Sequence, residues 1–126
     1  MSLETWKAEF YPVPASKCPK KDALRRSLQK WLGLRKTSLK RHGIEQEVAC
    51  LTDGECALLM SDTTCPLCRW HRDCSGCPLL LVRGVCCFED DDDSLGGPWN
   101  YWRATGDPNP MIHLIRKAIK KQGAKP

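Results

Sequence analysis

Four cysteines in the middle of the chain have the residue type and the spacing to bind a metal ion. They form two C-x-x-C pairs, Cys65 with Cys68 and Cys74 with Cys77, and five residues separate the pairs. Each pair can place two sulfurs on one ion, and Zn²⁺ prefers a tetrahedral set of four ligands. In a reducing compartment this pairing favours metal over disulfides. We therefore predict one structural zinc ion that stabilises this part of the chain.

Other donors lie close enough in the sequence to change this ligand set. Cys86 and Cys87 follow the two pairs and His71 lies between them, so one of these residues could replace one of the four. An iron–sulfur cluster, which also takes four thiolates, is the alternative cofactor. The cysteines without such spacing are expected to be buried and inert; they are Cys18, Cys50 and Cys56.

The sequence does not contain the motifs of the common metal and thiol enzymes. A zinc deaminase requires a His-x-Glu near a Pro-Cys-x-x-Cys, and no histidine here is followed by x-Glu. The H-E-x-x-H helix of a metalloprotease is also missing. His42 and His113 have no partner in the sequence, so we expect them to be solvated or to cap helices. We predict that the protein is not an enzyme.

Charge is segregated along the chain behind a formal net charge of +5. Residues 1–42 hold eleven lysines and arginines against three acids, whereas residues 43–110 hold twelve acids against four arginines. The first stretch could neutralise phosphates, with a tryptophan stacking on a base. The residues predicted for nucleic-acid binding are Lys21, Arg25, Arg26, Lys30, Trp31, Arg35, Lys36, Lys40 and Arg41.

An acidic run follows the cysteines. Glu89 precedes Asp90, Asp91, Asp92 and Asp93, and the run leads into a Gly-Gly-Pro stretch. Such a run could enter the nucleic-acid-binding groove of a partner protein in place of phosphate. The alternative is an ordinary solvated loop. We expect residues 90–93 to contact a protein partner.

The elements that would position these residues are predicted to form one domain over residues 1–126. Residues 1–19 are expected to be an extended arm because of Pro12 and Pro14, with its aromatic residues docked on the domain. Residues 20–43 are predicted to be helical and basic, with Gly43 as a left-handed stop. A cysteine-rich metal centre (44–88), an acidic flexible loop (89–106) and a C-terminal helix (107–122) follow.

These elements predict a small fold of α-helices and irregular structure. Helices from both termini would pack around a zinc-knuckle-like centre. No apolar run approaches the about 20 residues of a membrane-spanning helix, and residues 1–10 do not form a secretory signal. We expect a cytoplasmic protein without a membrane partner.

Several segments together resemble a group of small, uncharacterised phage and bacterial proteins. The shared segments are Trp6 to Pro12 (WKAEFYP), Ser27 to Leu34 (SLQKWLGL), Cys65 to Leu79, Gly84 to Cys87 and Gly106 to Met111 (GDPNPM). Their CxLC and CxGCPL cysteines are the ones described above. The resemblance implies a mobile-element origin, hence the cytoplasm of a host cell, and metal binding with a fourth ligand between Gly84 and Cys87. It implies no activity.

Two functions are compatible with these features. The first is a non-enzymatic, zinc-stabilised protein-interaction module, such as a phage-type inhibitor or adaptor acting on a host nucleic-acid-handling complex. The alternative is a nucleic-acid-binding protein that uses the basic segment between residues 17 and 41. Retention on heparin would favour the second, and a complex resistant to nuclease would favour the first.

Overall fold

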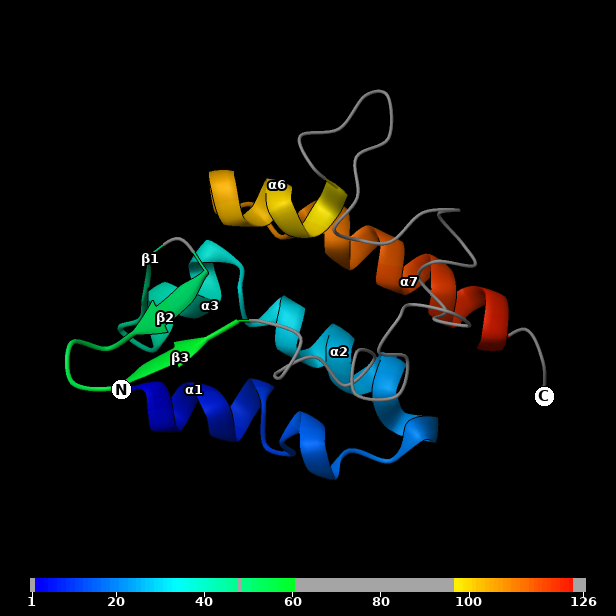
Figure 1. Cartoon of the computed structure of the whole chain (residues 1–126), viewed down its shortest axis with the longest axis horizontal. Helices are drawn as coiled ribbons and strands as arrows, with labels where there is room; N and C mark the ends of the chain where they lie inside the picture. The colour runs from blue at the N-terminus through cyan, green and yellow to red at the C-terminus, as the bar shows by residue number, and fades with distance from the viewer. Residues whose placement is uncertain (1, 48, 61–96, 124–126) are drawn as a thin grey trace.

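The computed structural model describes residues 2–47, 49–60 and 97–123, and Figure 1 shows how their elements are arranged. The helices of the first half are α1 (Leu3–Phe10), the 3₁₀ turns η1 (Ala15–Lys17) and η2 (Lys20–Asp22), α2 (Ala23–Leu32) and α3 (Lys36–Arg41). The strands are β1 (Glu45–Glu47), β2 (Cys50–Thr52) and β3 (Ala57–Leu59). The chain ends with α6 (Gly97–Thr105) and α7 (Asn109–Gly123).

The segment predicted to be an extended arm forms the helix α1. Ser2 caps this helix: the Ser2 hydroxyl accepts a hydrogen bond from the backbone N–H of Thr5 at 3.3 Å, and Thr5 Oγ1 accepts one from the backbone N–H of Ser2 at 2.9 Å. This reciprocal pair satisfies N–H groups that the start of a helix leaves unpaired. The prediction was wrong because Pro12 ends the helix at Phe10 but does not disturb the residues before it.

The aromatic side chains of α1 dock on the rest of the protein, as predicted. Trp6 is fully buried, and its Nε1 donates to the backbone oxygen of Gly33 at 2.8 Å. Phe10 lies so close to the same glycine that a Cβ atom there would be 2.4 Å from Phe10 Cγ. Only glycine permits this approach. The end of α2 is therefore fixed against α1.

The C-terminal helix was predicted over 107–122, and α7 confirms it. The carboxylate of Asp107 accepts from the backbone N–H of Asn109 at 3.0 Å, and Pro108 and Pro110 occupy the entry to the helix. The predicted apolar stripe is the one that is buried, with Ile119 partly so: Met111, Leu114, Ile115, Ala118 and Ile119. This stripe packs on α2, so helices from both ends of the chain share one core (Figure 1).

Part of the segment predicted to be a flexible loop, residues 89–106, is helical. Residues 97–105 form α6, which buries Trp102 against Trp31 with ring centroids 5.3 Å apart in an edge-to-face arrangement. Such a contact adds to the burial of two large rings. The helix was not predicted because the Gly-Gly-Pro sequence at its start is typical of a loop. The helix ends at Gly106, which has a positive φ of 78°.

The segment predicted to be irregular, from residue 44 onward, begins with a small antiparallel sheet of order β1–β2–β3. Gln46 pairs with Leu51, and Leu51 pairs with Leu58. Leu51 is fully buried, whereas both outer strands are largely exposed. Strands of three residues are too short to show the alternation that predicts a strand.

The turn between β2 and β3 ties the sheet to the start of α1. Oδ1 of Asp53 accepts hydrogen bonds from the backbone N–H groups of Glu55 and Cys56, and Oδ2 accepts one from Leu3 at 2.9 Å. Backbone hydrogen bonds from Cys56, Leu3 and Glu55 favour the ionised carboxylate and lower the pKa of Asp53 to about 2. The sheet, α1 and α3 therefore lie together at one end of the molecule (Figure 1).

Candidate functional site

The predicted metal ligands lie outside the described residues. Residues 61–96 contain all four predicted zinc ligands, the three substitutes and the acidic run; these are Cys65, Cys68, Cys74, Cys77, His71, Cys86, Cys87 and Asp90 to Asp93. Within residues 2–47, 49–60 and 97–123, no group of three or more His, Cys, Asp or Glu side chains is arranged to hold a metal ion. The zinc site accordingly stays a prediction from the sequence.

The other three cysteines lie in different surroundings from one another. Cys18 is buried, as predicted, and burial raises the pKa of its thiol, with a further contribution from the carboxylate of Asp22. Cys50 is only partly buried and Cys56 is exposed on the β2–β3 turn. The prediction that all three are buried was therefore wrong for Cys56, because a turn places it at the surface.

Two members of the predicted nucleic-acid-binding set are in the core. Lys30 is 2% exposed and Trp31 is 1% exposed, so neither side chain can contact a nucleic acid in this structure. The ammonium group of Lys30 lies 5.7 Å from the centroid of the Trp31 ring. The buried face of α2 includes Ser27 and Lys30 together with Trp31, whereas Leu28 and Leu32 are only partly buried. The packing of α2 against α7 and α6 determines that this face is buried.

The remaining members of the set lie at the surface. Arg26 is half-buried, and its guanidinium donates to the side chain of Gln29 at 3.0 Å. The others are exposed: Lys21, Arg25, Arg35, Lys36, Lys40 and Arg41. Of these, Arg35, Lys36, Lys40 and Arg41 belong to α3 or immediately precede it. This helix therefore carries the densest part of the predicted surface.

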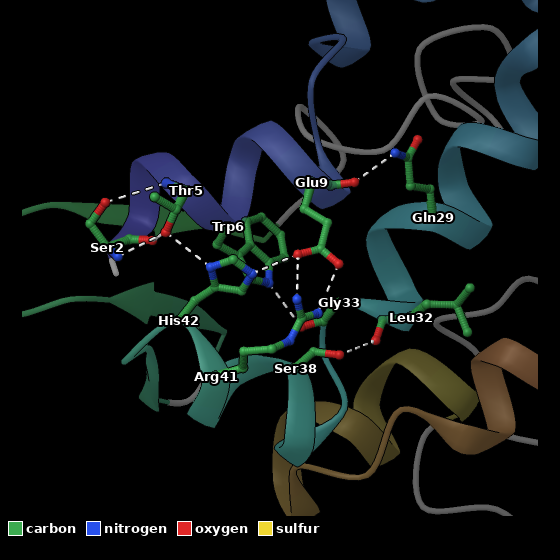
Figure 2. Close-up of polar contacts among 10 residues, drawn as sticks. All are labelled: Ser2, Thr5, Trp6, Glu9, Gln29, Leu32, Gly33, Ser38, Arg41 and His42. Atoms are coloured by element: carbon green, nitrogen blue, oxygen red, sulfur yellow. Dashed lines mark hydrogen bonds and ion pairs between the residues drawn. The ribbon is translucent and has the colours of Figure 1, made fainter.

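One face of α3 is tied to α1 by a polar cluster that we call the clasp, made of Glu9, Arg41, His42 and Thr5 (Figure 2). The guanidinium of Arg41 donates two parallel hydrogen bonds of 2.8 Å to the carboxylate of Glu9. Nε2 of His42 lies 2.8 Å from the same carboxylate, and its Nδ1 lies 2.9 Å from the Thr5 hydroxyl. The clasp brings together residues that are 33 positions apart in the sequence.

Both ring nitrogens of His42 have a hydrogen-bond partner in the clasp. The Thr5 hydroxyl that contacts Nδ1 is also bonded to the backbone oxygen of Ser2 at 2.8 Å. Nε2 faces an ionised carboxylate, which can only accept. The hydrogen bond from Arg41, followed by that from His42, lowers the pKa of Glu9, and Glu9 in turn raises the pKa of Arg41.

The clasp has the order hydroxyl, imidazole, carboxylate that nucleophilic enzymes use. Its hydroxyl, however, belongs to the capping box of α1 and is already hydrogen-bonded to both backbone groups of Ser2. Thr5 also does not line either of the cavities described below. We therefore assign the clasp a structural role, that of holding α3 on α1. The sequence predicted a solvated or capping His42. His42 is the C-cap residue of α3, as predicted, but its side chain is only 8% exposed and so is not solvated.

The opposite side of α3 borders a depression that we call the α3 groove. It consists of a cavity of about 750 Å³ and a smaller one of about 460 Å³, which share Lys36 and Gly106. The charged residues that line them are Arg35, Lys36, Lys40, Arg103, Glu45 and Asp107. The turn at Gly106 brings the end of α6 to this place, and Gln46 of β1 donates to the backbone oxygen of Trp102 at 3.3 Å. The groove thus forms where three segments distant in sequence meet.

The cations of the groove lack the partners that the clasp provides. In the part of the chain that the structure describes, the side chains of Lys36, Lys40 and Arg103 are exposed and form no ion pair. Arg103 comes from α6, and sequence reasoning missed it because nothing near it in the sequence is basic. Four cations face two carboxylates in the lining, so the groove carries net positive charge.

Comparison with known proteins gives no relative for this chain. No family model, no curated protein and no solved structure matches it. The resemblance to the phage and bacterial proteins with CxLC and CxGCPL cysteines therefore stays a prediction. In the described residues, none of the helices has both the length and the apolar character needed to cross a membrane.

Proposed function

We propose that this protein binds nucleic acid without catalysing a reaction on it, and that the α3 groove contacts the phosphate backbone. The observation that carries the proposal is the convergence of Lys36, Lys40 and Arg103 on one cavity without ion-pair partners among the described residues. Like charges that converge raise the local potential and attract polyanions. Lysines and arginines that neutralise phosphates release the counterions condensed on the nucleic acid, and this release supplies essentially all of the non-specific affinity.

The charge of the surrounding helices supports the same proposal. None of α2, α3 and α7 contains an aspartate or a glutamate, although together they carry ten of the sixteen lysines and arginines among the described residues. Over all described residues, sixteen lysines and arginines stand against eight acids. A nucleic acid approaching from this side would meet little repulsion, because the acids of the chain are concentrated in other segments.

The test is the salt dependence of binding to a mixed-sequence DNA duplex, followed by fluorescence anisotropy. Each phosphate contact that is lost should lower the slope of log K against log salt by about 1. We therefore expect K36Q/K40Q to lower the slope by about 2 and R103Q by about 1. The matched control is K7Q/K17Q, which removes two charges from α1 and η1, neither of which lines the groove. Equal losses in the control and in K36Q/K40Q would contradict the groove proposal, and no binding by the unchanged protein would contradict the function.

The zinc-stabilised centre is a second part of the proposal, and it rests on the sequence. Four cysteine thiolates in two C-x-x-C pairs are a donor set that suits a closed, structural zinc site. When bound, the ion would cross-link the two pairs and add folding free energy. Elemental analysis should find about one zinc per chain, lost in Cys65→Ser, with unfolding on chelation. Iron in its place would favour the iron–sulfur alternative.

A protein partner is the other candidate function. The sequence supports it through the separation of an acidic run, Asp90 to Asp93, from a basic body. An inhibitor or adaptor of this kind would form a complex with its target that survives nuclease treatment. A complex that requires nucleic acid would instead support the groove proposal.

A further inference from the structure

The exposed face of α7 is basic in the second half of the helix. Packing of its apolar stripe on α2 leaves Asn109 and five further side chains exposed, and we call these five the α7 track: His113, Arg116, Lys117, Lys120 and Lys121. No acid lies in this helix, and none of the five forms an ion pair among the described residues. Two basic residues occur in each of the last two turns.

The track begins where the α3 groove ends. Asn109, the first residue of α7, lines the smaller cavity together with Arg35, which follows α2. Fifteen residues at about 1.5 Å per residue make α7 about 22 Å long. Since α2 and α7 meet at this cavity and pack side by side, they run antiparallel (Figure 1). The exposed Lys21 and Arg25, at the start of α2, therefore lie beside the far end of the track.

We propose that the ligand is double-stranded nucleic acid whose phosphate backbone contacts the α3 groove and continues along the α7 track. This inference rests on the proposed function, because it extends the same phosphate contacts. At 3.4 Å per base pair, the length of α7 corresponds to about six or seven base pairs. The groove and α7 meet at the smaller cavity, whose lining holds Arg35 and Lys36 and one acid, Asp107.

The chemistry of the surface favours a nucleic acid over an acidic protein. Protein interfaces have an apolar or aromatic centre, and the track offers none. Among the described residues the exposed large hydrophobic side chain is Leu59, on β3 and outside the track. A surface on which cations outnumber acids matches a backbone of repeated phosphates.

The placement of the aromatic residues favours a duplex over a single strand. Proteins that bind single strands stack bases on aromatic side chains. Trp31 and Trp102 are buried against each other and offer no stacking surface, and the half-buried Trp99 has its ring 6.0 Å from that of Trp102. A protein helix that contacts the phosphate backbone of a duplex, in contrast, does not require the bases to unstack.

The experiment compares K117Q/K120Q with the control K7Q/K17Q, using a duplex longer than about seven base pairs and one of its single strands. On the duplex, K117Q/K120Q should lower the salt slope by about 2, while the control leaves it nearly unchanged. K117R/K120R, which keeps both charges, should restore the slope. The unchanged protein should bind the duplex at least about tenfold more tightly than the single strand, because the single strand lacks the second row of phosphates. Circular dichroism confirms that all variants fold.

The outcomes separate this inference from the proposed function. If K36Q/K40Q weakens duplex binding and K117Q/K120Q behaves like the control, the track is wrong and the groove stands. Equal affinity for the single strand would overturn the duplex assignment. If the unchanged protein binds neither probe, both proposals fail.

Discussion

The two sides of α3 use basic residues in opposite ways. On the side of α1, Arg41 and His42 share the carboxylate of Glu9 at 2.8 Å. On the other side, Lys36 and Lys40 line the α3 groove without an ion-pair partner among the described residues. The comparison shows that a basic segment is not one functional unit: cations that are neighbours in the sequence are divided between holding the fold and facing a ligand.

The largest loss of stability should come from replacing Trp6, the buried residue that fixes α1 against the end of α2. We predict that Trp6→Ala destabilises the protein by about 3–5 kcal/mol, because it removes a fully buried aromatic side chain and its hydrogen bond to Gly33. α1, and with it Glu9, would lose its position against α3. Chemical denaturation measures the change. A loss below about 1 kcal/mol would mean that α1 contributes little to the fold.

Removing the imidazole should have an intermediate effect. We predict that His42→Ala costs about 1–3 kcal/mol, since two hydrogen bonds and an edge-to-face contact with Phe10, with centroids 6.0 Å apart, are lost. Glu9→Gln should destabilise in the same direction by a smaller amount. The control is Lys40→Gln, on the other side of the same helix. Equal effects at His42 and Lys40 would erase the distinction between the two sides.

Low pH should lower the stability of the protein through two carboxyls that contact or belong to α1, those of Asp53 and Glu9. The carboxyls of Asp53 and Glu9 have lowered pKa values in the folded state, so each contributes stability that is present above its unfolded value and is lost as the pH falls. For Asp53 the window runs from an unfolded value of 3.8 down to about 2. Thermal melts between about pH 6 and pH 2 should show this decline. Asp53→Asn should flatten the curve in that window, and an unchanged curve would contradict the turn geometry.

The smallest effect on stability should come from the groove. We predict that K36Q/K40Q changes the free energy of unfolding by less than about 0.5 kcal/mol, since both side chains are exposed and unpaired among the described residues. The same variant should lose binding to duplex DNA. Loss of stability together with binding would mean that these lysines belong to the fold.

Residues whose structure is decided by their nearest neighbours were predictable. The start of α7 follows from Asp107 and the two prolines, its buried face follows from the apolar spacing, and Gly43 takes the left-handed φ of 68° expected of a helix stop. The same reasoning failed for α1 and α6. Their burial depends on contacts with residues of α2 and the segment after it, and the prolines and glycines around them outweighed weak helical signals, including the local capping box of Ser2 and Thr5.

The sequence predicted which residue types the candidate site contains, but not which of these residues are exposed or meet. The sequence determined that this protein has a dense basic segment, a C-terminal amphipathic helix and a cysteine pattern suited to zinc, because these depend on residue type and local spacing alone. Tertiary structure decided that Lys30 is buried, that Arg41 is paired with Glu9, and that Arg103 joins Lys36 and Lys40 at one groove. The physical reason is that exposure and ion pairing depend on which helix faces meet, and residues far apart in the chain determine that packing.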